Sequence, residues 1–108
     1  MLLKSLSLFQ MMTKEYILQK LKSSKAVLSR FGIRSVGLFG SYVRNENTHY
    51  SDIDLLIDFD PQKESFDNFM KVCNFFEELF GNQKVDIVTK NGLSPHIGPK
   101  ILSEVVYV

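Results

Sequence analysis

The 108-residue sequence predicts a small α/β (α+β) domain in which helices pack on one mixed β-sheet. Apolar residues recur at helical spacing over residues 13–31 and again over residues 63–80. They alternate with acidic residues over 51–60 and 84–89, as in half-buried strands. The hydrophobic content of 44% is enough for one core and leaves little for a second. We therefore expect a single domain over residues 12–108.

The first predicted helix covers residues 13–31. Thr13 is a suitable N-cap, and Gly32 is a suitable residue to follow the helix C-terminus. The apolar period then shortens over residues 34–40, which predicts a buried strand. Gly40 ends that strand in a tight turn.

A short helix is expected next, with Ser41 as its N-cap and its end near Asn45. A polar loop follows, and then the second predicted strand. Its apolar residues are Ile53, Leu55, Ile57 and Phe59, and the acids on its other face are Asp52, Asp54 and Asp58. Pro61 ends the strand.

A long amphipathic helix over residues 63–80 and a third strand over residues 84–89 complete the regular pattern. The apolar stripe expected on this helix, and expected to be core, is Phe66, Phe69, Met70, Cys73, Phe76 and Phe80. In the tail, a turn is expected at residues 91–92 and a short helix beginning near Pro99, because proline does not fit a helix interior.

The overall charge does not indicate a nucleic-acid or membrane partner. Lysine and arginine number 13 against 12 acids, for a formal net charge of +1. The single cysteine, Cys73, excludes an internal disulfide and fits a reducing compartment, and no Cys/His spacing resembles a zinc site. The expected location is the cytoplasm.

Residues 1–11 are expected to be an N-terminal extension, disordered or helical, outside the domain. Their apolar run is interrupted by serines, and no small-residue cleavage site follows it, so a secretory signal is not expected. The run is also too short to span a bilayer.

Two aspartates on the second predicted strand indicate a metal-binding site. Asp52 and Asp54 share one face and lie about 7 Å apart along a strand. If strand 84–89 lies beside strand 51–60, Asp86 falls next to Asp54. Two such charges about 4 Å apart repel by about 4 kcal/mol at an effective dielectric of 20. A divalent cation would relieve this, and oxygen ligands favour a hard ion such as Mg²⁺ or Mn²⁺, which takes few carboxylates plus substrate phosphates.

The glycine turn supplies the other half of this hypothesis. Gly40 lets the backbone approach a ligand, and Ser41 begins a predicted helix whose free N–H groups favour an anion. Arg44 lies on the same turn. A triphosphate could be held there while metal ions neutralise it from the side of the acids, as nucleotidyl transfer requires.

Each feature also has a simpler interpretation. Gly-Ser between a strand and a helix is common turn chemistry, and acids on one strand face are usually solvated, as we expect for Asp58 and Asp60. Arg44 alone is most often a surface cation, and His49 and His96 are expected to be loop residues. The combination of Gly-Ser, ten residues, Asp-x-Asp and a later third acid favours the phosphate and metal site.

The stretch "GSYVRNENTHYSDIDLLIDF" resembles the Gly-Ser-x10-Asp-x-Asp signature of the polymerase-beta-like nucleotidyltransferases. With the short length and the later "KVDIVTKNGLSP", the chain resembles the minimal nucleotidyltransferase (MNT) family from about residue 12 onward. The resemblance implies the following roles: Gly40 and Ser41 bind nucleotide phosphates, Asp52 and Asp54 hold Mg²⁺, and Asp86 completes the site as ligand or base.

The family usually has Gly-Ser-x-Ala-Arg-Gly, whereas this chain has Val43 and Asn45 at the alanine and last glycine positions. Asparagine tolerates a left-handed helix end nearly as well as glycine, so we expect the turn to be kept.

The resemblance further implies a partner, because such proteins are commonly antitoxins of helical HEPN-domain ribonuclease toxins. The leading hypothesis is a Mg²⁺-dependent enzyme that transfers AMP from ATP to a tyrosine of the toxin. Two alternatives remain open: a non-catalytic antitoxin that acts by stoichiometric binding, and nucleotidyl transfer to a small molecule. The last would need residues to hold the acceptor, and the domain has few to spare.

Overall fold

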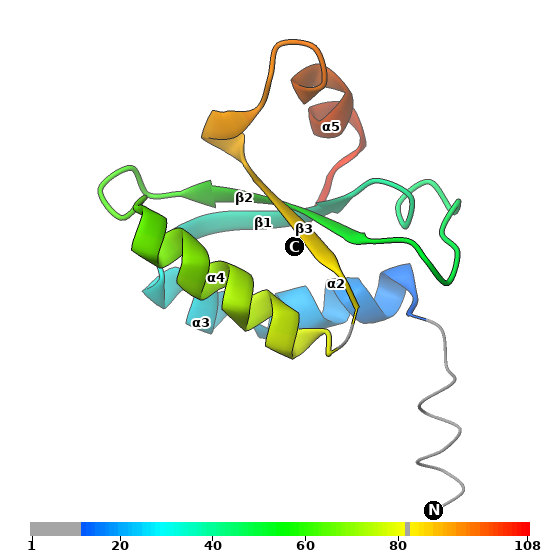
Figure 1. The fold of residues 1–108 in the computed structure, drawn as a ribbon, viewed down its shortest axis with the longest axis horizontal. Coiled ribbons are helices and arrows are strands. Elements are labelled where there is room, and N and C mark those ends of the chain that lie inside the picture. Colours follow the sequence, from blue (N-terminus) through cyan, green and yellow to red (C-terminus); the bar gives the residue numbers. More distant parts are fainter. Residues whose placement is uncertain (1–11, 82) are drawn as a thin grey trace, which may run out of the picture.

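The computed structural model describes residues 12–81 and 83–108, so the expectation for residues 1–11 lies outside its range. The described residues form one four-stranded sheet with helices on both faces (Figure 1). The order of the strands is β3-β2-β1-β4. Strand β1 (Ile33–Phe39) is antiparallel to β2 (Ile53–Phe59) and to β4 (Val106–Tyr107), whereas β3 (Val85–Thr89) is parallel to β2. The predicted mixed sheet is confirmed.

The predicted first helix is two helices, α2 (Lys14–Ser23) and α3 (Lys25–Arg30), so the prediction of one uninterrupted helix was wrong. The break lies at Ser24. Its hydroxyl donates to the carbonyl of Lys20 at 2.8 Å. Serine side chains that bond local carbonyls compete with the helical backbone, which is why this segment bends here.

The predicted N-cap of the first helix is confirmed, whereas the long helix begins at Phe66, three residues later than predicted, with an N-cap that was not predicted. Thr13 accepts a hydrogen bond from the backbone N–H of Tyr16 at 3.1 Å. Ser65 caps α4 (Phe66–Leu79) by accepting from the N–H of Asn68 at 3.1 Å. Such bonds satisfy N–H groups that the helix itself leaves free.

The apolar stripe predicted on α4 was partly wrong. Val72 and Phe76 are fully buried, whereas Phe66 is 77% exposed, Met70 is 41% exposed and Cys73 is only half-buried. At about 100° per residue, Met70 points about 160° away from Val72. The six predicted positions span about 120° of the helix, but the packed face is centred near Val72 and Phe76, so the predicted stripe was rotated too far towards Met70.

Both faces of β2 are buried in part. The apolar residues predicted on one face, Ile53, Leu55, Ile57 and Phe59, are all buried against α2, α3 and α4. On the other face Leu56 is buried with Phe39 and Ile101. Ile101 belongs to α5 (Gly98–Glu104), which begins near the predicted position and covers this second face.

Strand β4 was not predicted. One residue separates it from α5, and it pairs with β1 opposite Gly37. A Cβ atom on Gly37 would lie 2.5 Å from Cγ2 of Val105, so glycine is needed for the chain to return so close to β1. A 3₁₀ turn, η1 (Lys90–Gly92), stands at the predicted turn after β3.

The short helix predicted after Gly40 was also wrong. The N–H groups of Val43 and Arg44 both bond to the carbonyl of Gly40, at 3.0 and 3.2 Å, which makes one turn. The chain leaves it at Asn45, whose φ of 59° is left-handed. The expectation that asparagine keeps this turn is confirmed, and the same left-handed residue stops further helix growth. Among the helices of residues 12–81 and 83–108, none is long and apolar enough to cross a membrane.

Candidate active site

The two acid-bearing strands are neighbours, which is the condition under which Asp86 was expected to lie next to Asp54. Strands β2 and β3 run parallel in a register that sets Asp54 directly opposite Asp86. Asp52 lies two residues before Asp54, just ahead of β2, and its carboxylate pairs with Lys84 at 3.6 Å. The sheet thus brings together the three carboxylates that the sequence singled out.

The electrostatics of these acids show that they crowd one another. Burial, and then the charges of Asp86 and Asp52, raise the pKa of Asp54 from its ordinary 3.8 to about 6, against the attraction of Arg44. Burial and contact with Asp52 raise the pKa of Asp86, and Lys84 opposes this effect. Each ionised acid therefore disfavours ionisation of the next, and a bound cation would relieve the repulsion.

Whether these residues suit a metal ion depends on donor type and on spacing. Carboxylate oxygens with raised pKa values suit a hard divalent cation such as Mg²⁺. Within the described ranges, however, no group of three or more His, Cys, Asp or Glu side chains forms a ready-made metal site. Mg²⁺ typically takes only one or two carboxylates and completes its shell with water and substrate phosphates, so the donor set fits a metal that arrives with a phosphorylated ligand.

The glycine turn lies against the acids. Gly40 has a φ of 83°, and a Cβ atom there would overlap Oδ2 of Asp54. Only glycine lets β1 end so close to this carboxylate. In the described part of the chain, the backbone N–H groups of Ser41 and Tyr42 and the hydroxyl of Ser41 make no hydrogen bond.

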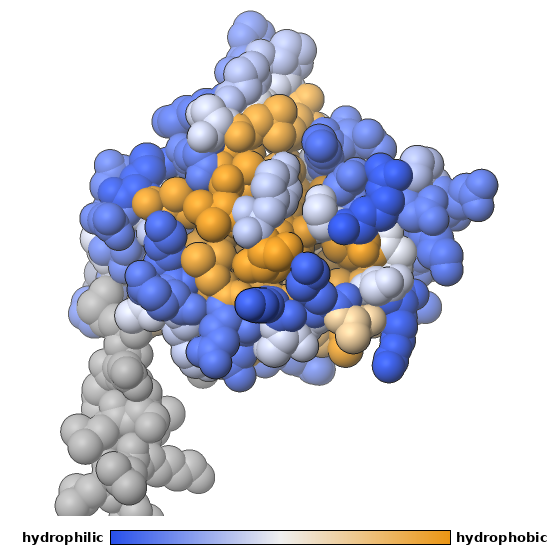
Figure 2. Space-filling model, turned by 180° about the vertical axis from the view of Figure 1, so that it is seen from behind, coloured by the Kyte–Doolittle hydropathy of each residue, from blue (hydrophilic) through white to orange (hydrophobic). Residues whose placement is uncertain are grey.

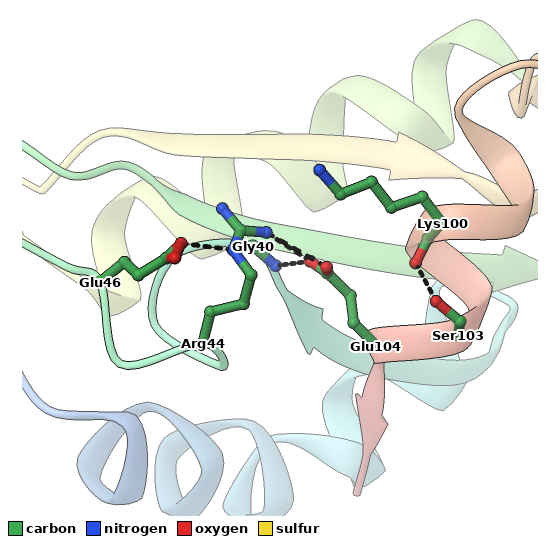
Figure 3. A network of polar contacts seen from close by, with 6 residues as sticks. All are labelled: Gly40, Arg44, Glu46, Lys100, Ser103 and Glu104. Carbon is green, nitrogen blue, oxygen red and sulfur yellow. Dashed lines mark hydrogen bonds and ion pairs between the residues drawn. The ribbon is translucent and has the colours of Figure 1, made fainter.

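The N–H of Gly40 itself is occupied. It donates to Oε2 of Glu104 at 2.5 Å, and Arg44 donates to both oxygens of Glu104, at 3.0 and 3.1 Å. Figure 3 shows Arg44 between Glu104 on α5 and Glu46 on the loop, to which its Nε donates at 2.7 Å. The predicted phosphate ligand Arg44 is therefore already held by two carboxylates.

Sequence reasoning missed Glu104. The residue is 64 positions from Gly40, and no motif includes it. A weak signal did exist, because Glu104 is the only acid in the tail over residues 91–108.

A cleft of about 420 Å³ opens beside the acids. Asp54 and Asp86 line it together with apolar side chains that include Phe39, Ile97 and Ile101. The cleft therefore combines carboxylates with apolar surface that can contact a ligand.

The face turned away in Figure 1 is also rich in apolar side chains. Figure 2 shows them gathered over its middle, with polar side chains around them.

Comparisons with known proteins agree with this geometry. A family model of the nucleotidyltransferase domain matches residues 20–108. The protein adenylyltransferase MntA of Thermococcus cleftensis is 42% identical over 99 residues, which are 91% of this chain and 98% of that protein. A solved structure assigned as a minimal nucleotidyltransferase is 29% identical, with a TM-score of 0.75, and the match covers 88% of this chain and 95% of that one.

A chain from a crystal structure of a toxin-antitoxin with AMP-PNP matches with a TM-score of 0.65 over 83% of this chain and 72% of its own length. At 18% identity it shows the shared fold alone. Together with the preceding structure, it confirms the predicted polymerase-beta-like fold.

Proposed function

This chain belongs to the nucleotidyltransferase domain family, and from that premise we propose that it transfers AMP from ATP to a protein partner with the help of Mg²⁺. The observation that carries the proposal is the direct pairing of Asp54 with Asp86 beside Asp52, with the Gly40 turn packed against Asp54. A metal-bound triphosphate needs carboxylates to hold its metal ion on one side and N–H donors for its phosphates on the other, and both lie at this end of the sheet.

The proposed partner is a toxin. A relative that is 42% identical is named a protein adenylyltransferase, and a chain of the same fold comes from a toxin-antitoxin structure. We take the toxin to be a HEPN-domain ribonuclease and its acceptor to be a tyrosine, as the sequence resemblance implies. Adenylylation of that tyrosine would neutralise the toxin, which makes this chain an antitoxin.

Each site residue has a role in the proposal. Asp52, Asp54 and Asp86 would hold Mg²⁺, which would neutralise phosphate charge when bound. With a pKa of about 6, Asp54 is mostly ionised at neutral pH and can act as a ligand before the metal arrives. Alternatively, Asp86 would act as the base that accepts the proton of the tyrosine hydroxyl.

The turn would bind the phosphates. The backbone N–H groups of Ser41 and Tyr42, which make no hydrogen bond within residues 12–81 and 83–108, and the Ser41 hydroxyl would donate to phosphate oxygens, in the way that successive backbone N–H groups bind anions elsewhere. Gly40 contributes by having no side chain, which keeps this turn next to Asp54. Arg44 would add positive charge beside the triphosphate while it stays bonded to Glu104.

The test is the intact mass of the toxin encoded next to this chain after incubation with the chain, ATP and Mg²⁺. We expect a gain of one or more AMP units, and no gain with Asp52→Asn. Asp58→Asn is the matched control, because Asp58 lies on the same strand face but pairs with Arg34 at 3.1 Å, away from the site. Full transfer by the Asp52→Asn protein would contradict the metal assignment.

A second candidate function is antitoxin action by binding alone. Two observations favour it: the absence of a ready-made metal site among the described residues, and large apolar side chains, such as Ile97 and Leu102, that are 54% and 45% exposed. Exposed apolar surface of this kind often marks a protein interface. Toxin inhibition that persists without ATP, and with the Asp52→Asn protein, would support this candidate over transfer.

A further inference from the structure

Glu104 connects the end of the chain to the glycine turn of the candidate site. Its carboxylate accepts the N–H of Gly40 and both oxygens accept from Arg44, so it ties together the two ends of the turn. We infer that Glu104 is a positioning residue for nucleotidyl transfer: it fixes the turn against Asp54 and is not displaced by the nucleotide. This inference rests on the proposed function.

Glu104 makes a charged hydrogen bond to Arg44 that is largely shielded from solvent. Its side chain is only 15% exposed, whereas the other carboxylate on Arg44, that of Glu46, is 60% exposed. Hydrogen bonds between charged groups are about twice as strong as neutral ones. One guanidinium nitrogen of Arg44, Nη1, donates to both oxygens of Glu104. The exposed contact with Glu46 is screened by solvent and adds little. Glu104 is therefore the partner that sets the position of Arg44.

The fold holds Glu104 in place from both sides. It is the last residue of α5, which packs on the sheet through Ile101, and only Val105 separates it from β4, which pairs with β1. A residue between two packed elements has little freedom to move away. The turn that ends β1 is consequently fixed by a residue from the far end of the chain.

The N–H groups of the turn have different partners. The N–H of Gly40 goes to Glu104, and the N–H groups of Ser41 and Tyr42 remain for phosphate. A phosphate that took the N–H of Gly40 would stand beside the largely buried Glu104 carboxylate, and the two negative charges would repel. The nucleotide is therefore expected to bind next to the Glu104 contact, without breaking it.

The test compares Glu104→Gln with Glu46→Gln. Glutamine keeps the shape of the side chain but removes its charge, and Glu46→Gln makes the same change on the exposed partner of the same arginine. With ATP, Mg²⁺ and the toxin, Glu104→Gln should lower kcat by about 10- to 100-fold, as small misplacements of substrate-positioning groups do. The KM for ATP should stay within about threefold, because the phosphate donors remain. Glu46→Gln should match the wild type.

A second readout needs no catalysis. In the wild-type protein labelled with ¹⁵N-glycine, the amide proton of Gly40 should resonate far downfield, as expected for a donor to a carboxylate. It should move upfield in Glu104→Gln, stay in place in Glu46→Gln, and stay in place when ATP and Mg²⁺ are added to the wild type.

Wild-type kcat in Glu104→Gln, or an unchanged Gly40 signal in that variant, would overturn the inference. An upfield move of the Gly40 signal on addition of ATP and Mg²⁺ would also overturn it, because it would mean that the nucleotide breaks the hydrogen bond between Gly40 and Glu104. If the wild type transfers no AMP, the proposed function fails, and the Gly40 signal still decides the role of Glu104. If Glu104→Gln does not fold, the wild-type signal with and without ATP and Mg²⁺ decides it.

Discussion

Replacing Asp54 with asparagine is expected to stabilise the ligand-free protein at neutral pH. Burial and the charges of Asp86 and Asp52 raise the pKa of Asp54 from 3.8 to about 6, so the folded state disfavours the ionised carboxyl. At about 1.4 kcal/mol per pKa unit, this corresponds to about 3 kcal/mol. Since the side chain is partly exposed, solvent screening lowers the expected gain to about 1–2 kcal/mol.

The gain should depend on pH in a defined direction. Below the unfolded pKa of 3.8 the carboxyl is protonated in both states, and it costs nothing. Between 3.8 and about 6 the folded state binds more protons than the unfolded state, so the free energy of unfolding falls as the pH rises. Above about pH 6 the carboxyl is ionised in both states, and the folded state bears the full destabilisation by its charge. The advantage of the asparagine variant should therefore be absent near pH 3.8 and full at pH 7.

Urea denaturation of both proteins in metal-free buffer with a chelator, near pH 4 and at pH 7, measures this difference. A gain of about 1 kcal/mol would raise the melting temperature by about 4–8 °C in a domain of this size. Asp58→Asn is the matched control on the same strand face. It loses the ion pair with Arg34 and should be destabilised by at most about 1 kcal/mol. A destabilised Asp54→Asn protein at pH 7, or a gain equal at both pH values, would refute the crowding of the acids.

Three further predictions test the site and the core. Mg²⁺ with ATP should raise the melting temperature of the wild type and raise that of Asp54→Asn much less, because binding to the folded state stabilises it; equal shifts in the two proteins would count against Asp54 as a ligand. Gly40→Ala should lower the free energy of unfolding by about 2 kcal/mol or more in urea denaturation, because alanine would have to adopt a left-handed backbone conformation and its Cβ atom would overlap Asp54. Gly81→Ala, with the same left-handed backbone and nothing within 4 Å, should cost only about 1 kcal/mol, and equal losses would contradict the contact with Asp54. Phe76→Ala should cost about 3–5 kcal/mol because the side chain is fully buried, whereas Phe66→Ala should change stability by less than about 0.5 kcal/mol; the reverse order would contradict the packing of α4.

The parts of the fold that follow from local pattern were predictable. A period of two along residues 51–60 and 84–89 placed the acids on one face, and the observed register then set Asp54 opposite Asp86. Caps such as Thr13 follow from the chemistry of single side chains. The break at Ser24 was missed because helical periodicity continues through it, and serine bends a helix only when its hydroxyl bonds the backbone.

The sequence by itself determined the strands β1, β2 and β3, the glycine turn after β1 and the identity of the acids, because alternation, glycine turns and charge are properties of neighbouring residues. Only the tertiary structure decided which face of α4 is buried, how the two-residue β4 pairs with β1, and that Glu104 reaches the N–H of Gly40. The last contact joins residues 64 positions apart. No local preference specifies such a pair, since the meeting of α5 with the end of β1 depends on how the whole sheet buries its apolar faces.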